Sequence, residues 1–242
     1  VWKKSFYLVG LALFSYTILT TGSRATYLGI FFSATYFFLL YPIYRAQTES
    51  KTPQRIIALK IAVAILLLSA LAGVAYVNIV KKYPTPLQEN RFFNSVVTRL
   101  SAQKLLEDTR FKALAIELDS VKARPILGYG PENFYVGFDK HYKATTPGLT
   151  GIVAWWDRAH NNIMQSASDA GILGVTAYLA LFIALFWQLQ RVKATEKKIG
   201  AYTEKTLLAH GVQATLIGYF SANLFSFDSF GSYLIFFLLV GY

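Results

Sequence analysis

The sequence predicts an all-α fold: a polytopic bundle of about six transmembrane helices with a largely helical insertion. Composition is the first observation, because 54% of the 242 residues are hydrophobic, 16% are aromatic and 15% are charged. A soluble domain of this length is normally less apolar. The second observation is a series of long apolar runs. The third is one long polar interval, which divides these runs into two groups.

Crossing roughly 30 Å of hydrocarbon takes about 20 apolar residues in a helix. Lipid offers no partner to backbone amides, so each long apolar run predicts a helix. The runs cover residues 5–20, 25–44, 56–80, 163–189, 206–225 and 230–242. They predict three helices over 1–80, a polar segment over 81–162, and three helices over 163–242.

The ends of the chain predict a piece of a longer protein, truncated on both sides. The chain opens on Val1, its single methionine is Met164, and the last apolar run is clipped at Tyr242. No small-residue cleavage site follows the first apolar run before Arg24, so a cleavable signal peptide is not predicted.

The short loops between apolar runs indicate their side of the membrane, because cytoplasmic loops are enriched in Lys and Arg. Residues 45–60 hold four cations against one acid, and residues 191–205 hold five against two. Both loops, together with Lys3 and Lys4, are therefore expected in the cytoplasm. Alternation then places the turn at 20–24, the segment 81–162 and the turn at 225–229 on the outer face.

The polar segment is not expected to be a flexible linker. It begins with a proline-stiffened exit over residues 81–86. Apolar positions at mixed helical spacings over residues 92–121 predict two amphipathic helices with a break near Asp108. The glycines and prolines of residues 125–131 predict a turn. Trp155 and Trp156, just before the fourth apolar run, are typical of an interfacial belt.

Several function classes are disfavoured. The net charge of +11 does not indicate a nucleic-acid partner, because most cations lie between apolar runs and set orientation. The chain has no cysteine, which excludes disulfides and thiolate metal sites. It has no GxxxxGKS-type phosphate loop, no HExxH motif and no paired acidic motif for Mg²⁺. His141 and His210 lack metal-ligand spacing to a partner, so we expect no metal and no cofactor.

Three polar positions on the expected outer face are candidates for chemistry. Arg24 closes a short turn between apolar helices, where a cation is costly unless it reaches water or an anion; an interfacial arginine is the alternative. Arg110 lies on the predicted amphipathic helices, where an exposed or salt-bridged arginine is the simpler explanation. His160 precedes the fourth run beside Asn161, and an ordinary helix-capping cluster also explains this pair.

Three blocks of this sequence resemble the O-antigen ligase and polymerase family. They are SRATYLG at 23–29, DTRFKALAIELDSVKARPILGYGPENF at 108–134 and AHNNIMQSASDAGILGV at 159–175. The family pattern is a Ser/Thr-Arg turn, an arginine-led helix running into Pro-x-x-Gly-x-Gly-x-x-x-Phe, and His-Asn followed by an acidic residue and Gly-x-x-Gly. The blocks occur in this order on one predicted face. The resemblance covers roughly residues 5 to 240 and implies that an amino-terminal half is missing here.

The resemblance implies glycosyl transfer at the outer face of the bacterial inner membrane. The donor would be a glycan on undecaprenyl diphosphate, and the acceptor a hydroxyl of lipid A-core or of another molecule. Arg24 and Arg110 would hold the diphosphate, with Arg158 as a helper, because guanidinium groups bind phosphate bidentately without a metal. His160, with an ordinary pKa of about 6.5, would accept the acceptor's proton as the sugar is displaced with inversion.

Asn161, Tyr129 and Asp169 complete the substrate-binding set that the resemblance implies. Asp169 matches the acidic position of the family, and helix packing or pairing with an arginine fits it as well as catalysis does. The glycines of the 125–131 turn would shape that turn. Tyr129 and Phe134 would face lipid or sugar.

These motifs do not identify the acceptor, so an O-antigen polymerase and a protein O-oligosaccharyltransferase remain alternatives with the same chemistry. An alternative of a different class is a transporter or scaffold that uses Arg24 and Arg110 only to hold an anionic lipid. A transporter is expected to place polar residues in paired broken helices at mid-membrane, and the sequence indicates little of this.

Overall fold

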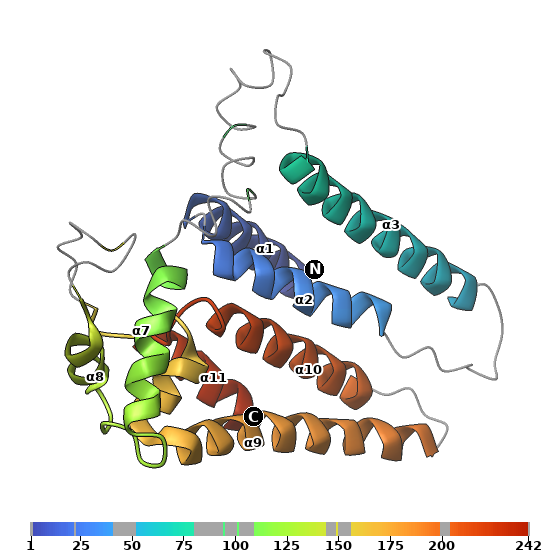
Figure 1. Cartoon of the computed structure of the whole chain (residues 1–242). Helices are drawn as coiled ribbons and strands as arrows, with labels where there is room; N and C mark the ends of the chain where they lie inside the picture. The colour runs from blue at the N-terminus through green and yellow to red at the C-terminus, as the bar shows by residue number, and fades with distance from the viewer. Residues whose placement is uncertain are drawn as a thin grey trace.

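The computed structural model describes residues 2–21, 23–40, 52–79, 94, 101, 109–143, 149, 156–198 and 204–241. Within these ranges the chain is helical and contains no strand, which confirms the all-α prediction. The helices are α1 (Trp2–Thr21), α2 (Arg24–Leu39), α3 (Thr52–Ile79), α7 (Thr109–Ala123), α8 (Phe134–His141), α9 (Asn162–Lys198), α10 (Glu204–Asn223) and α11 (Phe230–Gly241). Helices α7 and α8 lie at one end of the longer helices (Figure 1).

Each predicted apolar run coincides in large part with one helix, namely α1, α2, α3, α9, α10 or α11. Among the described residues, two stretches are long and apolar enough to cross a membrane: Ile57–Ile79 and Asn162–Lys198. Ser5–Ile18 and Phe230–Gly241 are shorter apolar helices. The number of crossings, about six, therefore stays a prediction.

Two glycines allow α2 and α10 to cross at close range. A Cβ atom added to Gly29 would lie 2.7 Å from the carbonyl oxygen of Gly218, and one added to Gly218 would lie 2.9 Å from the Cβ of Ser33. A larger residue at either glycine would push the helices apart. Small residues are what lets helices approach closely in a membrane, and here they hold the start of α2 against α10 (Figure 1).

A buried polar cluster joins α9, α10 and α2 further along the bundle. Lys193 lies within α9, only 7% exposed, and not in a loop as the cation count assumed. Its Nζ donates to Gln213 Oε1 at 2.9 Å and lies 3.1 Å from His210 Nδ1. His210 Nε2 lies 2.8 Å from the carbonyl oxygen of Phe37. An ammonium on one ring nitrogen and a carbonyl on the other fit a neutral imidazole that carries its proton on Nε2.

The insertion, residues 81–162, forms a small core where α7 and α8 meet the start of α9. The core consists of Ala113, Ile116, Phe134, Phe138, Leu149 and Ala159, with Tyr142, Trp156 and Met164 packed against it. Phe134 is 1% exposed, so its ring faces this core and neither lipid nor sugar. Trp156 stacks on Phe138 with ring centroids 5.6 Å apart and likewise packs inward, not in an interfacial belt.

Only part of the predicted insertion can be compared with the structure. α7 begins at Thr109, next to the predicted break, and is the second of the two amphipathic helices expected over 92–121. The exit at 81–86, the first amphipathic helix and Trp155 lie outside the described residues. The short helix α8 was not predicted, because eight residues that include a glycine give little periodic signal.

The backbone of α9 is interrupted near its start, where the sequence predicted an unbroken helix. Ala170 has φ −136° and ψ 15°, and Gly171 has φ 61° and ψ −153°. The N–H of Ile172, just after the break, donates to the carbonyl oxygen of Pro125 at 2.8 Å. A Cβ atom added to Gly171 would lie 2.3 Å from the backbone of Ile126. Only glycine fits this position, for both its positive φ and its close backbone neighbour.

The predicted turn at 125–131 is present, and it is the partner of that break. The N–H groups of Tyr129 and Gly130 donate to the carbonyl oxygens of Ser168 at 2.7 Å and Asp169 at 2.9 Å. Gly128 has φ +67°, and a Cβ atom there would lie 2.3 Å from the Ser168 oxygen. Backbone groups that leave a helix at a break need new partners. The turn supplies them, so the two glycine-rich blocks of the sequence form one unit.

Asp228 is a buried carboxylate, 3% exposed, that accepts hydrogen bonds from three helices. Its carboxylate accepts hydrogen bonds from the Asn162 amide of α9 and the Tyr219 hydroxyl of α10. It also accepts from the Asn223 amide at 3.1 Å and from Ser232 Oγ of α11 at 2.9 Å. A buried carboxylate is tolerated when several donors satisfy it. The sequence analysis did not single out this residue.

Asp228→Ala is expected to lower the free energy of unfolding by about 3 kcal/mol, because several buried donors lose their acceptor. Thermal unfolding in detergent measures the loss. Asp119→Ala is the matched control, since Asp119 is an exposed carboxylate of α7 that pairs with Lys122 at 3.0 Å. Exposed pairs contribute little. Equal losses in the two variants would contradict the role given to Asp228.

Candidate active site

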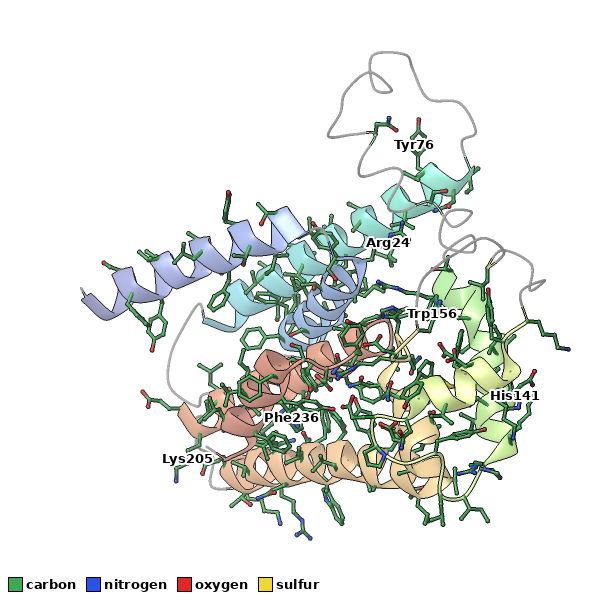
Figure 2. The ribbon with its side chains drawn as sticks, turned by 90° about the vertical axis from the view of Figure 1, so that its left-hand side faces the viewer. Arg24, Tyr76, His141, Trp156, Lys205 and Phe236 are labelled. Atoms are coloured by element: carbon green, nitrogen blue, oxygen red, sulfur yellow. The ribbon has the colours of Figure 1, made fainter. Side chains whose placement is uncertain are left out.

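A cavity of about 390 Å³ lies where α2, α7, the segment before α9 and the link between α10 and α11 meet. Its lining consists of Arg24, Ala25, Leu28, Arg110, Leu114, Glu117, His160, Asn161, Leu224 and Phe225. These residues come from four separate parts of the chain. Arg24 lies at the junction between the long helices and the insertion (Figure 2).

Arg24 is the first residue of α2, a position where a cation does not favour the helix itself. The N-terminus of a helix carries a partial positive charge and favours acids, and the first turn of α2 contains none. Ser23 before it has extended backbone, φ −68° and ψ 119°, so the helix begins at the arginine. The Nη1 atom of Arg24 is buried. Guanidinium and helix N-terminus together form a positive site suited to an anion.

Arg110 is the second residue of α7 and reaches the opposite wall of the cavity. Its Nη1 donates to the carbonyl oxygen of Phe225 at 3.2 Å. This bond ties the start of α7 to the link between α10 and α11. A guanidinium fork is suited to planar, bidentate contacts with an anion.

The His160 ring is held by aromatic neighbours on two sides. Its centroid lies 5.5 Å from that of Trp156, edge to face, and 5.2 Å from that of Phe227. Asn161 caps α9, because its Oδ1 accepts from the N–H groups of Ile163 at 2.9 Å and Met164 at 3.1 Å. The capping interpretation is therefore correct for Asn161. Both His160 and Asn161 line the cavity.

Asp169 lies about two turns into α9 and supports the segment that carries His160. Both of its carboxylate oxygens accept from Gln165 Nε2 at 3.0 Å. Gln165 Oε1 in turn accepts from the N–H of Ala159 at 2.9 Å. This chain of hydrogen bonds runs from the break in α9 to the residue before His160. In the structure Asp169 is a packing residue and does not line the cavity.

The structure thus brings Arg24, Arg110, His160 and Asn161 together and leaves the other predicted site residues outside this lining. Arg158 Nη2 pairs with Glu132 Oε2 at 3.0 Å. The Tyr129 ring lies against the backbone of Gly137, where an added Cβ would approach it to 2.7 Å. Tyr129 therefore belongs to the packing around the 125–131 turn, whereas the Arg158 guanidinium lies 5.8 Å from the ring centroid of Phe227.

A family model described as O-antigen ligase matches residues 9–179. The chain belongs to the O-antigen ligase family. Neither the curated proteins nor the solved structures compared with the chain gave a match.

Membership of this family indicates the general function of the chain. O-antigen ligase family proteins are inner-membrane proteins of lipopolysaccharide biosynthesis, and the family indicates glycan transfer of the ligase or polymerase type. The matched residues include both arginines and the histidine of the cavity. They also include the turn at 125–131 and the break in α9.

Glu117 is a cavity residue of this O-antigen ligase family member that the sequence analysis missed. It is 4% exposed, and burial raises the pKa of its carboxyl from 4.5 to about 7. A sequence pattern could have identified Glu117: Arg110, Leu114 and Glu117 recur every three or four residues, on one face of α7. A single acid on an amphipathic helix more often marks its solvated face, so the signal was not distinctive.

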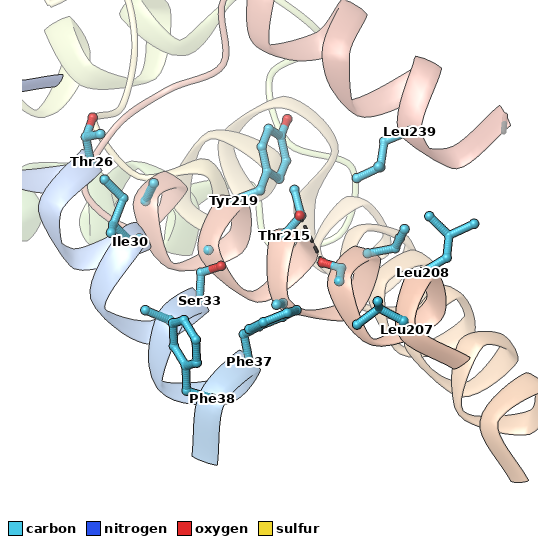
Figure 3. Close-up of a pocket in the computed structure, with 17 residues that line it drawn as sticks. Thr26, Ile30, Ser33, Phe37, Phe38, Leu207, Leu208, Thr215, Tyr219 and Leu239 are labelled. Carbon is cyan, nitrogen blue, oxygen red and sulfur yellow. Dashed lines mark hydrogen bonds between the residues drawn. The ribbon is translucent and has the colours of Figure 1, made fainter. Parts of the chain in front are cut away.

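A larger cavity of about 870 Å³ runs between α2 and α10, with Leu239 of α11 at its edge (Figure 3). The described residues that line it are uncharged; the α2 side includes Ile30, Phe37 and Phe38. Its α2 lining begins at Thr26, one residue from Ala25 of the smaller cavity. This groove suits hydrocarbon, whereas the polar groups that can perform chemistry lie in the smaller cavity.

Proposed function

We propose that this O-antigen ligase family member is a metal-independent, inverting glycosyltransferase. It transfers a glycan from undecaprenyl diphosphate to a hydroxyl group of lipid A-core. The observation that carries the proposal is the convergence of Arg24, Arg110 and His160 on one cavity, although they come from three distant parts of the chain.

The donor's leaving group is a diphosphate, on which negative charge builds as the anomeric C–O bond breaks. Two guanidinium groups stabilise that charge through charge-assisted hydrogen bonds. Arg24 adds the N-terminus of α2 to this field, and Arg110 adds that of α7. Fixed positive groups of this kind perform the task that a divalent cation performs in other glycosyltransferases.

His160 acts as the general base. Its neutral imidazole accepts the proton of the acceptor hydroxyl while the hydroxyl oxygen forms a bond to the anomeric carbon. The bond from that carbon to the diphosphate oxygen breaks on the opposite side, which inverts the configuration. Undecaprenyl diphosphate leaves with the bonding electron pair, and the imidazolium later loses its proton to water.

The lipid part of the donor lies along the apolar groove between α2 and α10. This groove contains no charged side chain among its described lining residues, and it begins next to the Arg24 end of the smaller cavity. The excess of cations over residues 45–60 and 191–205, at the ends of the long helices, supports an active site on the periplasmic face.

Transfer in nanodiscs tests the proposed function and its acceptor. The donor is a glycan on undecaprenyl diphosphate, offered with lipid A-core, with a second donor molecule, or with a protein acceptor. We expect lipid A-core to be modified. Modification of the second donor would identify a polymerase, and modification of protein would identify an oligosaccharyltransferase. Absence of transfer from every polyprenyl-diphosphate donor would contradict all three.

Arg24→Ala and Arg110→Ala are each expected to weaken donor binding by about tenfold or more, because charged hydrogen bonds contribute roughly 1.5–3 kcal/mol. Calorimetric titration of donor into nanodiscs measures this. Arg191→Ala is the control, since Arg191 lies on α9 against Trp187, 4.9 Å from its ring centroid, outside the cavity. Unchanged donor affinity in both cavity variants would remove them from the donor site.

A further inference from the structure

Glu117 poses an electrostatic problem for a cavity that receives an anion. It is the acidic residue among the lining side chains, which otherwise supply two guanidinium groups, an imidazole and an amide. Its side chain is almost entirely buried, at 4% exposure. A carboxylate beside a diphosphate would repel it through a medium that screens charge less than water does.

The carboxyl of Glu117 has no hydrogen bond or ion pair within the part of the chain that the structure describes. Buried polar groups are normally paired, and an exception in a cavity indicates a missing ligand or proton. Asp119, two residues on, differs because it is exposed and pairs with Lys122 at 3.0 Å. Glu117 therefore combines burial, access to the cavity and an unused hydrogen-bonding capacity.

We propose that Glu117 contacts the bound donor as the neutral acid and donates a hydrogen bond to one of its anionic oxygens, so that donor binding is coupled to the uptake of one proton. This inference rests on the proposed function, since it requires an anionic donor in this cavity. It assigns Glu117 to substrate binding, separate from the base role of His160.

The surroundings of Glu117 determine the direction of this coupling. Among the described residues, the charged and titratable groups that share the cavity with it are Arg24 from α2, Arg110 from α7 itself and His160 before α9. The sides of α8 and α9 that meet α7 contribute the apolar rings of Phe134 and Phe138 and the side chain of Met164. Burial in this setting raises the pKa of the Glu117 carboxyl to about 7, so the neutral acid is accessible near neutral pH.

A bound anion raises the pKa of Glu117 further, because it adds negative charge near the carboxyl. Donor binding then draws a proton from solution wherever free Glu117 is ionised. The apparent donor affinity is highest below pH of about 7 and falls as the pH rises above it, by up to tenfold for each pH unit. The test uses a His160→Gln background, so that the imidazole does not contribute to the measured pH dependence.

The test measures donor affinity by calorimetry from about pH 6 to 9, in buffers of different ionisation enthalpy that report proton uptake. The probe is farnesyl-diphosphate-linked N-acetylglucosamine, a diphosphate diester with no proton of its own in this range. The His160→Gln background removes the histidine contribution. Glu117→Gln mimics the neutral acid in shape and in donor capacity, and Asp119→Asn is the matched control on the same helix.

In the His160→Gln background, we expect affinity to fall about tenfold from pH 7 to pH 8.5, with uptake of close to one proton. Glu117→Gln should bind equally well at low pH, show no such fall and take up no proton. Asp119→Asn should behave as the parent. Glu117→Ala should bind less well at every pH, since it lacks the donating group.

Two results would overturn the inference alone: a parent affinity that does not change with pH, or a pH dependence that survives Glu117→Gln. In either case wild-type transfer of the glycan in nanodiscs would leave the proposed function standing. A wild-type protein that neither binds the donor nor transfers its glycan would overturn the proposed function and this inference together.

Discussion

His160→Ala is expected to lower kcat for glycan transfer by about 10² to 10⁴, the usual contribution of general-base catalysis. Donor affinity should stay within a few-fold of wild type, because the proposed diphosphate contacts come from Arg24 and Arg110 on other helices. Single-turnover transfer in nanodiscs gives the rate, and calorimetric titration gives the affinity. A large loss in rate without a loss in binding is the signature of a group that acts only in the transition state.

Two further variants separate proton transfer from packing. The His160 ring packs against Trp156 and Phe227, so its removal could disturb their positions. His160→Gln keeps a polar group of similar reach and should lose a comparable factor in kcat. His141→Ala is the control, because His141 ends α8 far from Arg24 (Figure 2) and its Nδ1 lies 2.9 Å from the Gly137 carbonyl oxygen. Full function in His160→Ala would favour an anionic-lipid transporter or scaffold.

Gly171→Ala is expected to remove more than about 4 kcal/mol from the free energy of unfolding, placing it among the most damaging single substitutions. The new Cβ would lie 2.3 Å from the carbonyl carbon and oxygen of Ile126. Those atoms belong to the backbone of the docked turn and cannot rotate away. The φ of 61° and ψ of −153° at this position add strain for any residue with a side chain. Thermal unfolding and detergent extraction yield measure the loss.

Gly211→Ala is the matched control for that substitution. Gly211 lies inside α10, and a Cβ atom there would meet nothing within 4 Å. Alanine is the better helix former, so we expect no loss and a gain of up to about 1 kcal/mol. If Gly171→Ala were as stable as Gly211→Ala, the turn at 125–131 would not be docked on the break in α9. Any folded Gly171→Ala protein should also transfer slowly, because the Asp169 to Ala159 hydrogen bonds that support His160 begin at this break.

The apolar runs predicted the long helices well, because a membrane leaves the backbone few alternatives to a helix. The break at Ala170 and Gly171 was not predictable in the same way. Alanine and glycine are common in membrane helices, and the break is stabilised by hydrogen bonds from a turn some forty residues earlier. Lys193 was counted as a loop cation because its partners, His210 and Gln213, come from another helix.

The residues of the candidate site were likewise predictable only in part. Arg24 and His160 stood out because a cation or imidazole next to apolar helices is rare and costly, whereas Arg110 became a candidate through the family resemblance. Glu117 did not, since acids are ordinary on amphipathic helices and only the contact between α7 and the long helices buries it. Tyr129 and Phe134 were expected to face ligand, yet the packing between α7, α8 and the turn takes up both rings.

The position of the bound diphosphate tests most directly whether Arg24, Arg110 and His160 form the donor site. A cryo-electron microscopy structure in nanodiscs, with farnesyl-diphosphate-linked N-acetylglucosamine bound, would locate it. We expect the diphosphate between the guanidinium groups of Arg24 and Arg110, the sugar beside His160, and the isoprenoid chain along the groove between α2 and α10. A diphosphate bound elsewhere, or a cavity that opens toward the cation-rich stretches at 45–60 and 191–205, would contradict the proposed function.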